Sequence, residues 1–204
     1  EYVTLPIRNL HRVPDNVLDE AAVFVEPLAA ALEILQQIPV HPEDRVLLIG
    51  AGRLGQLIAP VLMRTGCDLR VIARHAQQIA LLTDQRIRVG RAEAVADRSV
   101  DLVVEATGSP AGFELARRVV RPRGTIVLKS TYHGSLQVDF SELVVQEITL
   151  VGSRCGPFEP ALRLLANGSV DPRPIVAARF PLAHGLEAFS AAGTSGTLKV
   201  LLEP

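Results

Sequence analysis

Short, continuous apolar runs alternate with longer stretches of helical periodicity through the middle of this chain. Continuous apolar runs are typical of strands that are buried on both faces of a sheet. They predict strands at 45–50, 69–73, 100–107, 124–130 and 148–153, and a shorter run at 86–89 is a candidate for one more. Helices are predicted between them, at 27–38, 54–65, 76–84, 110–120 and 141–147. This alternation predicts an α/β fold, with a doubly wound parallel sheet of six strands and right-handed crossovers.

The two ends of the chain follow a different pattern. Residues 1–13 carry two strand-like pieces, "YVTLP" and "NLHRV", and Pro14 with Asp15 predicts a helix start. A helix at 160–168, a strand at 175–180, a helix at 182–192 and a strand at 197–202 are predicted for the tail. The sequence begins without Met, in what reads as a strand already under way, so we expect a part of something longer. We expect a domain at 27–156, flanked by segments 1–26 and 157–204 that form an incomplete second layer.

Composition narrows the class of protein. Of the 204 residues, 48% are hydrophobic and 21% are charged, so the chain can bury a sizeable core. The net charge is −1 and there is no Trp, which argues against a nucleic-acid partner. No apolar run is long enough to span a membrane and no signal peptide is recognisable, so we expect a cytoplasmic protein. Cys67 and Cys155 are too few for a disulfide framework and are predicted to be reduced.

The first central strand runs into a glycine-rich turn. Gly50, Gly52 and Gly55 form G-x-G-x-x-G, with Arg53 and Leu54 between the last two glycines. In a dinucleotide-binding turn these glycines permit the tight turn, the approach of a pyrophosphate and close packing of helix on strand. The alternative is a simple strand-to-helix turn. The buried strand before it and the helix after it favour the dinucleotide site of a Rossmann fold.

The end of the second strand bears on which dinucleotide is bound. An NAD site usually has Asp or Glu there, about 20 residues after the turn, for the ribose 2′-hydroxyl. Here the strand ends in Ala73, Arg74 and His75. Arg pairs well with a phosphate dianion, so we expect NADP(H) rather than NAD(H). The alternative is that Arg74 is a solvated residue at a strand end.

Three later strand ends supply further candidates for the cofactor, because parallel strands end at the same edge of a sheet. Thr107 and Gly108, with Ser109, are candidates to face the nicotinamide ribose, although Ser109 equally suits a helix cap before Pro110. Residues 129–131, including Ser130, are expected to line the same crevice. Gly152 and Ser153 are candidates to hold the carboxamide. Arg154 faces either the substrate or solvent.

Glu26 is an acid in the apolar stretch "VFVEPLAAA", at a predicted helix start. It either stabilises the helix dipole or lies at a metal. The chain contains no H-E-x-x-H or C-x-x-C spacing that would supply further ligands, and no G-x-S-x-G of an esterase.

Taken in order, these segments resemble the medium-chain dehydrogenase/reductase family, in its zinc-dependent alcohol, sorbitol and threonine dehydrogenase-like branch. The resemblance extends over nearly the whole chain and runs through the following segments: "EYVTLPIRNLHRVPD", "AAVFVEPLAAAL", "DRVLLIGAGRLGQLIA", "VDLVVEATGS", "RPRGTIVL", "EITLVGSRCG" and "FPLAHGLEAFSAAGTSGTLKVLL".

The resemblance implies an enzyme with a Rossmann domain and a GroES-like catalytic domain. The flanking segments here would belong to an incomplete form of that catalytic domain, without its N-terminal half. It implies reversible hydride transfer between an alcohol or polyol and NAD(P), assisted by zinc. Glu26 matches the Glu of an "EPL" motif that lies at the catalytic zinc, directly or through water. The other zinc ligands lie in the absent half, so we expect this chain to bind cofactor without catalysing.

The resemblance also implies a homo-oligomer, a dimer or tetramer, with the sixth strand at the interface. Two alternatives remain open. One is the zinc-free quinone or enoyl reductase-like branch, which Glu26 disfavours, and the other is a dinucleotide-binding module without chemistry.

Overall fold

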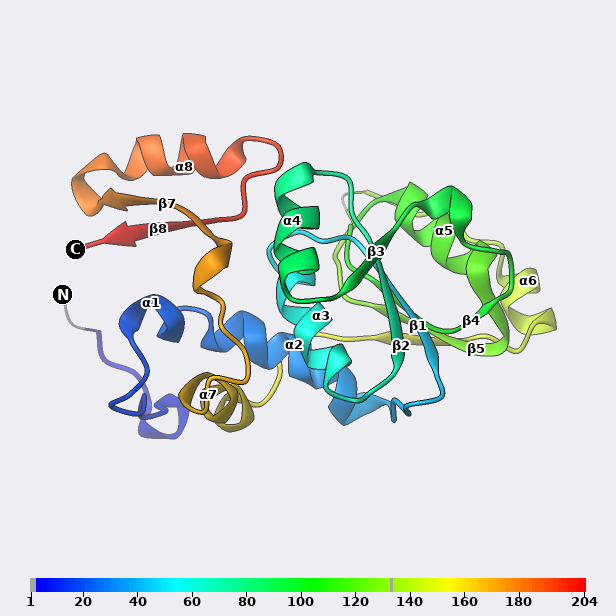
Figure 1. The fold of residues 1–204 in the computed structure, drawn as a ribbon, viewed down its shortest axis with the longest axis horizontal. Helices are drawn as coiled ribbons and strands as arrows, with labels where there is room; N and C mark the ends of the chain where they lie inside the picture. The colour runs from blue at the N-terminus through cyan, green and yellow to red at the C-terminus, as the bar shows by residue number, and fades with distance from the viewer. Residues whose placement is uncertain (1–2, 133) are drawn as a thin grey trace.

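A six-stranded parallel sheet forms the centre of the computed structural model, which describes residues 3–132 and 134–204 (Figure 1). Its strand order is β3-β2-β1-β4-β5-β6, so the order reverses between β1 and β4. The strands are β1 (Arg45–Ile49), β2 (Asp68–Ile72), β3 (Arg88–Gly90), β4 (Val100–Glu105), β5 (Val120–Leu128) and β6 (Thr149–Gly152). The predicted Rossmann-type sheet is therefore confirmed, including its short third strand.

Helices cover both faces of this sheet. The described helices are α1 (Asp19–Ala22), α2 (Val25–Gln37), α3 (Gly55–Met63), α4 (Ala76–Asp84), α5 (Pro110–Val119), α6 (Phe140–Val145), α7 (Phe158–Ala166) and α8 (Gly185–Gly193). Of these, α1 packs on α7 and α8 packs within the tail, so neither covers the sheet. Single 3-10 turns lie at Ile7–Asn9, Ala92–Ala94, Arg173–Ile175 and Leu182–His184. Helix α3 continues through Pro60.

The alternation of side chains along β1 shows why both faces need cover. Val46 and Leu48 face one side, where they pack with α2, α3 and α7, whereas Leu47 and Ile49 face the side covered by α5. All four are at most 3% exposed. Burial on both faces produces the uninterrupted apolar run in the sequence, because a half-exposed strand would alternate with polar residues.

The tail forms a small unit beside the main sheet. Strands β7 (Val176–Pro181) and β8 (Lys199–Glu203) pair in parallel, and α8 connects them. In Figure 1 this unit and α1 lie at the opposite end of the molecule from β4 and β5. These elements agree with the pattern predicted for the tail. The division at residues 26 and 156, and the assignment of both ends to a GroES-like domain, stay predictions.

The strands predicted near the start of the chain are wrong for the residues that the structure describes. Residues 3–13 contain a 3-10 turn at Ile7–Asn9 and no strand, and Tyr2 of the first piece lies outside the described residues. The whole stretch is exposed, so no neighbouring strand is available to pair with it. The helix predicted from Pro14 is also shorter than expected, because α1 starts at Asp19.

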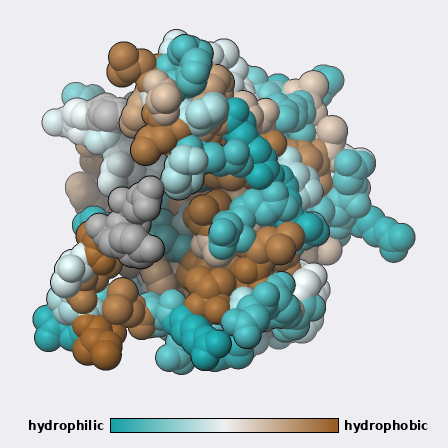
Figure 2. Space-filling model, turned by 90° about the vertical axis from the view of Figure 1, so that its left-hand side faces the viewer, coloured by the Kyte–Doolittle hydropathy of each residue, from teal (hydrophilic) through white to brown (hydrophobic). Residues whose placement is uncertain are grey.

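Large apolar side chains are exposed on these terminal segments. Ile7, Leu186 and Phe189 are 87%, 89% and 73% exposed. Figure 2 shows this end of the molecule, with apolar patches around a hollow. Patches of this kind commonly mark interaction surfaces. Among the described helices, none is long and apolar enough to cross a membrane.

Candidate functional site

The glycine turn joins β1 to α3 at the point where the strand order reverses. Gly50 has a φ of 104°, a conformation that favours glycine, and a Cβ there would lie 2.8 Å from Thr107 Cγ2. A Cβ at Gly55 would overlap the carbonyl oxygen of Gly50, whereas a Cβ at Gly52 would meet no described atom within 4 Å. Gly50 and Gly55 are thus required by the fold, and Gly52 leaves open space beside the turn.

Free backbone donors surround that space. The N–H groups of Gly52, Arg53 and Leu54 have no acceptor within residues 3–132 and 134–204, and the Gln56 N–H is bonded to Gly52 at 2.9 Å. Unpaired N–H groups at the start of a helix, together with the helix dipole, favour anions. The turn therefore offers donors that suit an anionic group.

A cavity of about 670 Å³ opens from the turn toward the ends of β2 and β4. Its lining includes Gly50, Gly52 and Thr107, and also Arg74 and His75. The structure thus brings together candidates separated by more than 50 residues in the sequence. The cavity size suits a nucleotide rather than a single ion.

Two arginines that the sequence interpretation missed lie in the same cavity. Arg91 follows β3 and Arg118 lies near the end of α5. Arg118 is bonded to Asp97 and to the Ala92 carbonyl, whereas Arg91 is exposed. Glu93 lines the cavity too and supplies a carboxyl group. Arg91 could have been found from the sequence because it directly follows β3, but that strand was predicted only as a candidate.

The turn after β4 is fixed by a buried acid. Glu105 is fully buried and accepts hydrogen bonds from the Thr107 N–H (2.6 Å), the Thr107 hydroxyl (2.5 Å) and the Tyr132 hydroxyl (2.5 Å). Ser109 accepts from the Gly112 N–H at 3.1 Å and so caps α5. Burial and the hydrogen bond to Glu105 raise the pKa of Tyr132. The Ser109 cap confirms one alternative, and Thr107 is held rigidly at the cavity wall.

The sequence contains a sign that Glu105 is a buried hydrogen-bond acceptor, a role that the sequence interpretation missed. Glu105 ends the apolar strand "VDLVVE", where an acid is expected to be buried with partners.

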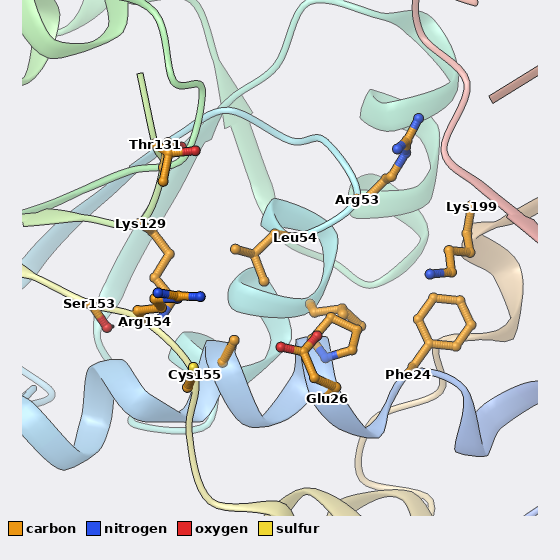
Figure 3. Close-up of a pocket in the computed structure, with 14 residues that line it drawn as sticks. Phe24, Glu26, Arg53, Leu54, Lys129, Thr131, Ser153, Arg154, Cys155 and Lys199 are labelled. Carbon is orange, nitrogen blue, oxygen red and sulfur yellow. Dashed lines mark hydrogen bonds between the residues drawn. The ribbon is translucent and has the colours of Figure 1, made fainter. Parts of the chain in front are cut away.

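A second cavity, of about 350 Å³, is lined by Leu54 among other residues and is drawn in Figure 3. Ser130, Ser153 and Arg154 line it, as expected of residues at the ends of β5 and β6, and so does Glu26 from the first turn of α2. Gly152 ends β6 beside this group. Figure 3 shows the Glu26 side chain rising from α2 toward the cavity, opposite Leu54. The two cavities share no lining residue in the part of the chain that the structure describes.

Lys129 is a buried cation in this second cavity. It is 8% exposed and its Nζ donates to Ser153 Oγ at 2.9 Å. Burial lowers the pKa of Lys129. The sequence placed Lys129 at the end of a strand but gave no sign of its burial, because the covering residues come from α2 and from the segment after β6.

Arg53 lines the smaller cavity, and its side chain is bonded to the tail. Its guanidinium donates to the carbonyl oxygens of Leu198 (2.8 Å) and Ala192 (2.5 Å). His75 lies against the same tail, since a Cβ on Gly196 would be 3.3 Å from His75 Nδ1. The side chain of Arg53 thus joins the glycine turn to the tail, and its backbone N–H has no acceptor among the described residues.

The described residues do not provide a complete zinc site. They contain no cluster of three His, Cys, Asp or Glu side chains with metal-binding geometry. Glu26 and the exposed Cys155 line the same cavity, but a protein zinc site takes at least three protein ligands. Glu26 can therefore supply one zinc ligand, and the residues that the structure describes do not complete the set.

Known proteins resemble this chain in sequence and in fold. The family model described as "Zinc-binding dehydrogenase" matches residues 55–167, more than half of the chain. Sorbitol dehydrogenase of Macaca fascicularis is 27% identical over 95% of this chain and 58% of its own length. L-threonine 3-dehydrogenase of Pectobacterium atrosepticum is 27% identical over 99% of this chain and 60% of its own length.

A solved structure shows the same fold. It is a protein from Sinorhizobium meliloti 1021, described as a zinc-binding dehydrogenase and bound to NADP, with a TM-score of 0.90 at 22% identity. The match covers 100% of this chain and 65% of that one. This chain therefore spans about 60% of the length of the curated relatives it matches.

Proposed function

This chain belongs to the zinc-binding dehydrogenase family, and we propose that it is the cofactor-binding portion of an NADP(H)-dependent oxidoreductase. The enzyme would transfer hydride between an alcohol or polyol and the nicotinamide. The observation that carries this proposal is the glycine turn, which has free N–H groups and borders a cavity that Arg74, at the end of β2, also lines.

The two cavities have complementary roles in this proposal. The larger one takes the adenosine half of the cofactor, with the pyrophosphate at the turn. The smaller one takes the nicotinamide and the substrate, with Leu54 against the ring and the Ser153 segment beside the carboxamide. Sorbitol and threonine dehydrogenases, as relatives, support an alcohol as substrate.

Zinc would serve as the Lewis acid that polarises the alcohol oxygen. Glu26 would contribute one ligand, directly or through water. The remaining ligands would come from outside the described residues, so this chain would bind cofactor without turnover.

The choice of NADP(H) rests on the cations at the larger cavity. Arg74 and Arg91 line this cavity together with the imidazole of His75, and the end of β2 carries no acid. Glu93 offers the opposite chemistry, a carboxyl that accepts a hydrogen bond from the 2′-hydroxyl of NAD. The two chemistries predict different responses to mutation.

Calorimetry with NADP⁺ and NAD⁺ tests this choice. Arg74→Ala is expected to weaken NADP⁺ binding by about tenfold, the loss of one charged hydrogen-bonding partner, and to leave NAD⁺ unchanged. Arg64→Ala, at an exposed arginine after α3, is the matched control. Equal affinity for both cofactors that Arg74→Ala leaves unaltered would refute the 2′-phosphate assignment, and loss of NAD⁺ binding in Glu93→Gln would favour NAD.

A further inference from the structure

The smaller cavity carries an excess of positive charge. Four cationic side chains line it, from Arg53, Lys129, Arg154 and Lys199, against one carboxyl group, that of Glu26. Arg53 is occupied by two carbonyl oxygens, and Lys199 lies 5.8 Å from the centre of the Phe24 ring. Lys129 and Arg154 form no ion pair within 4.0 Å among the described residues, and Glu33 and Glu26 act on Lys129 only at longer range.

Lys129 is the more unusual of these two. A side chain that is 8% exposed holds an ammonium group, and the one bond that the structure gives it goes to the Ser153 hydroxyl. An ammonium has three donors, so two have no acceptor in the part of the chain that the structure describes. A buried cation is costly unless it is paired, which makes Lys129 a group prepared for an anion.

Arg154 lines the same cavity as Lys129 and is exposed. Figure 3 shows its guanidinium directed into this cavity, on the side toward Glu26. An arginine fork and a lysine point charge together are well suited to a phosphate or a carboxylate. Glu26 lines the same cavity, and its carboxylate can accept hydrogen bonds from hydroxyl groups.

We propose that the substrate of this site is an alcohol with an anionic group, a phosphate or a carboxylate, bound by Lys129 and Arg154. The inference rests on the proposed function and names the class of its substrate. Under the proposed function the cofactor's phosphates lie beside Gly50–Gly52, which line the larger cavity, so they do not account for the two cations. The reacting hydroxyl would lie on the Glu26 side.

Calorimetry on the full 204-residue chain tests the proposal with three probes that share one carbon skeleton: D-sorbitol 6-phosphate, D-gluconate and D-sorbitol. Saturating NADPH blocks the glycine turn and leaves no hydride acceptor. At constant ionic strength, at least one anionic probe is expected to bind about tenfold or more tightly than D-sorbitol, as for a charged hydrogen bond. The anionic probe that binds distinguishes a phosphate from a carboxylate substrate.

Variants assign the effect to the two cations. Arg154→Gln should reduce the preference for the anionic probe by about tenfold, and Arg154→Lys, which keeps the charge, should restore part of it. Lys129→Met should have the same effect as Arg154→Gln. If that buried substitution prevents folding, Arg154→Gln decides alone, because Arg154 is exposed. Arg163→Gln, on the exposed side of α7, is the control that should change nothing.

The outcomes separate this inference from the proposed function. If NADPH binds and D-sorbitol binds as well as both anionic probes, the anionic substrate is refuted while the cofactor site stands. The same holds if Arg154→Gln leaves the preference unaltered. If NADPH does not bind, the proposed function fails, and the probes are then compared on the cofactor-free chain, where the same preference and the same variants decide.

Discussion

Alanine at Gly52 separates the two roles that a glycine can have in the turn after β1. A Cβ at this position would meet no described atom within 4 Å, so the substitution disturbs nothing in the folded chain itself. Alanine also restricts the unfolded chain, so Gly52→Ala is expected to leave the free energy of unfolding unchanged or to raise it by up to about 1 kcal/mol. The same methyl group projects into the space where a pyrophosphate would approach the backbone.

The expected result for Gly52→Ala is a stable protein that binds NADP⁺ at least about tenfold more weakly, a loss of ~1.4 kcal/mol of binding free energy. Gly55→Ala should behave differently. Its Cβ would overlap the Gly50 carbonyl oxygen, and overpacking of this kind costs about 1–3 kcal/mol of stability. For a chain of this size that is a fall in melting temperature of roughly 2–10 °C.

Thermal melts and calorimetry with NADP⁺ measure the two effects separately. Gly185→Ala is the matched control, because a Cβ on this first residue of α8 also meets nothing within 4 Å among the described residues. It should leave the affinity for NADP⁺ unchanged and, like Gly52→Ala, leave the free energy of unfolding unchanged or raise it by up to about 1 kcal/mol. Gly52→Ala protein with wild-type affinity for NADP⁺ would show that the turn does not hold the pyrophosphate, and a large loss of stability would show that the open space has been misjudged.

Two further predictions concern pH. Hydrogen bonds from Arg45, and then from Arg121, hold the pKa of Asp101 well below its ordinary range, so its contribution to stability is full above about pH 4 and is lost as the pH falls further. Asp101→Asn should cost about 2 kcal/mol at pH 7 and flatten the acid limb of stability in urea titrations; an acid limb as steep as that of the wild type would contradict this. Burial, and then the hydrogen bond to Glu105, raise the pKa of Tyr132, so its contribution is full below about pH 10 and is lost above it. Tyr132→Phe should cost about 1–3 kcal/mol and flatten the alkaline limb in melts from pH 8 to 11, and unchanged melts would count against the bond.

The sheet could be predicted because its signal is local. Residues 46–49 and 102–105 are buried on both faces, so each strand appears as an apolar run without reference to its partners. The same reasoning gave a wrong prediction of strands for residues 3–13. Their Val, Leu and Ile residues also resemble short strands, yet in the structure they are exposed and have no partner.

The site could be predicted in part for a related reason. The glycine turn and the Ser109 cap are made by neighbours in sequence, within a few residues of each other. The bond from Arg53 to Leu198 spans 145 positions, and the burial of Lys129 depends on α2 and on the segment after β6. No local pattern encodes such contacts, so the sequence showed which residues stand at strand ends but not what covers them.

The position of Arg53 gives the turn a second role. Its backbone faces the proposed phosphate while its side chain holds two carbonyl oxygens of the tail. Cofactor binding and the docking of the tail are therefore coupled through Arg53, and the coupling free energy is the same in both directions. If a bound dinucleotide strengthens the contact between Arg53 and the tail, that contact raises the affinity for the dinucleotide by the same factor.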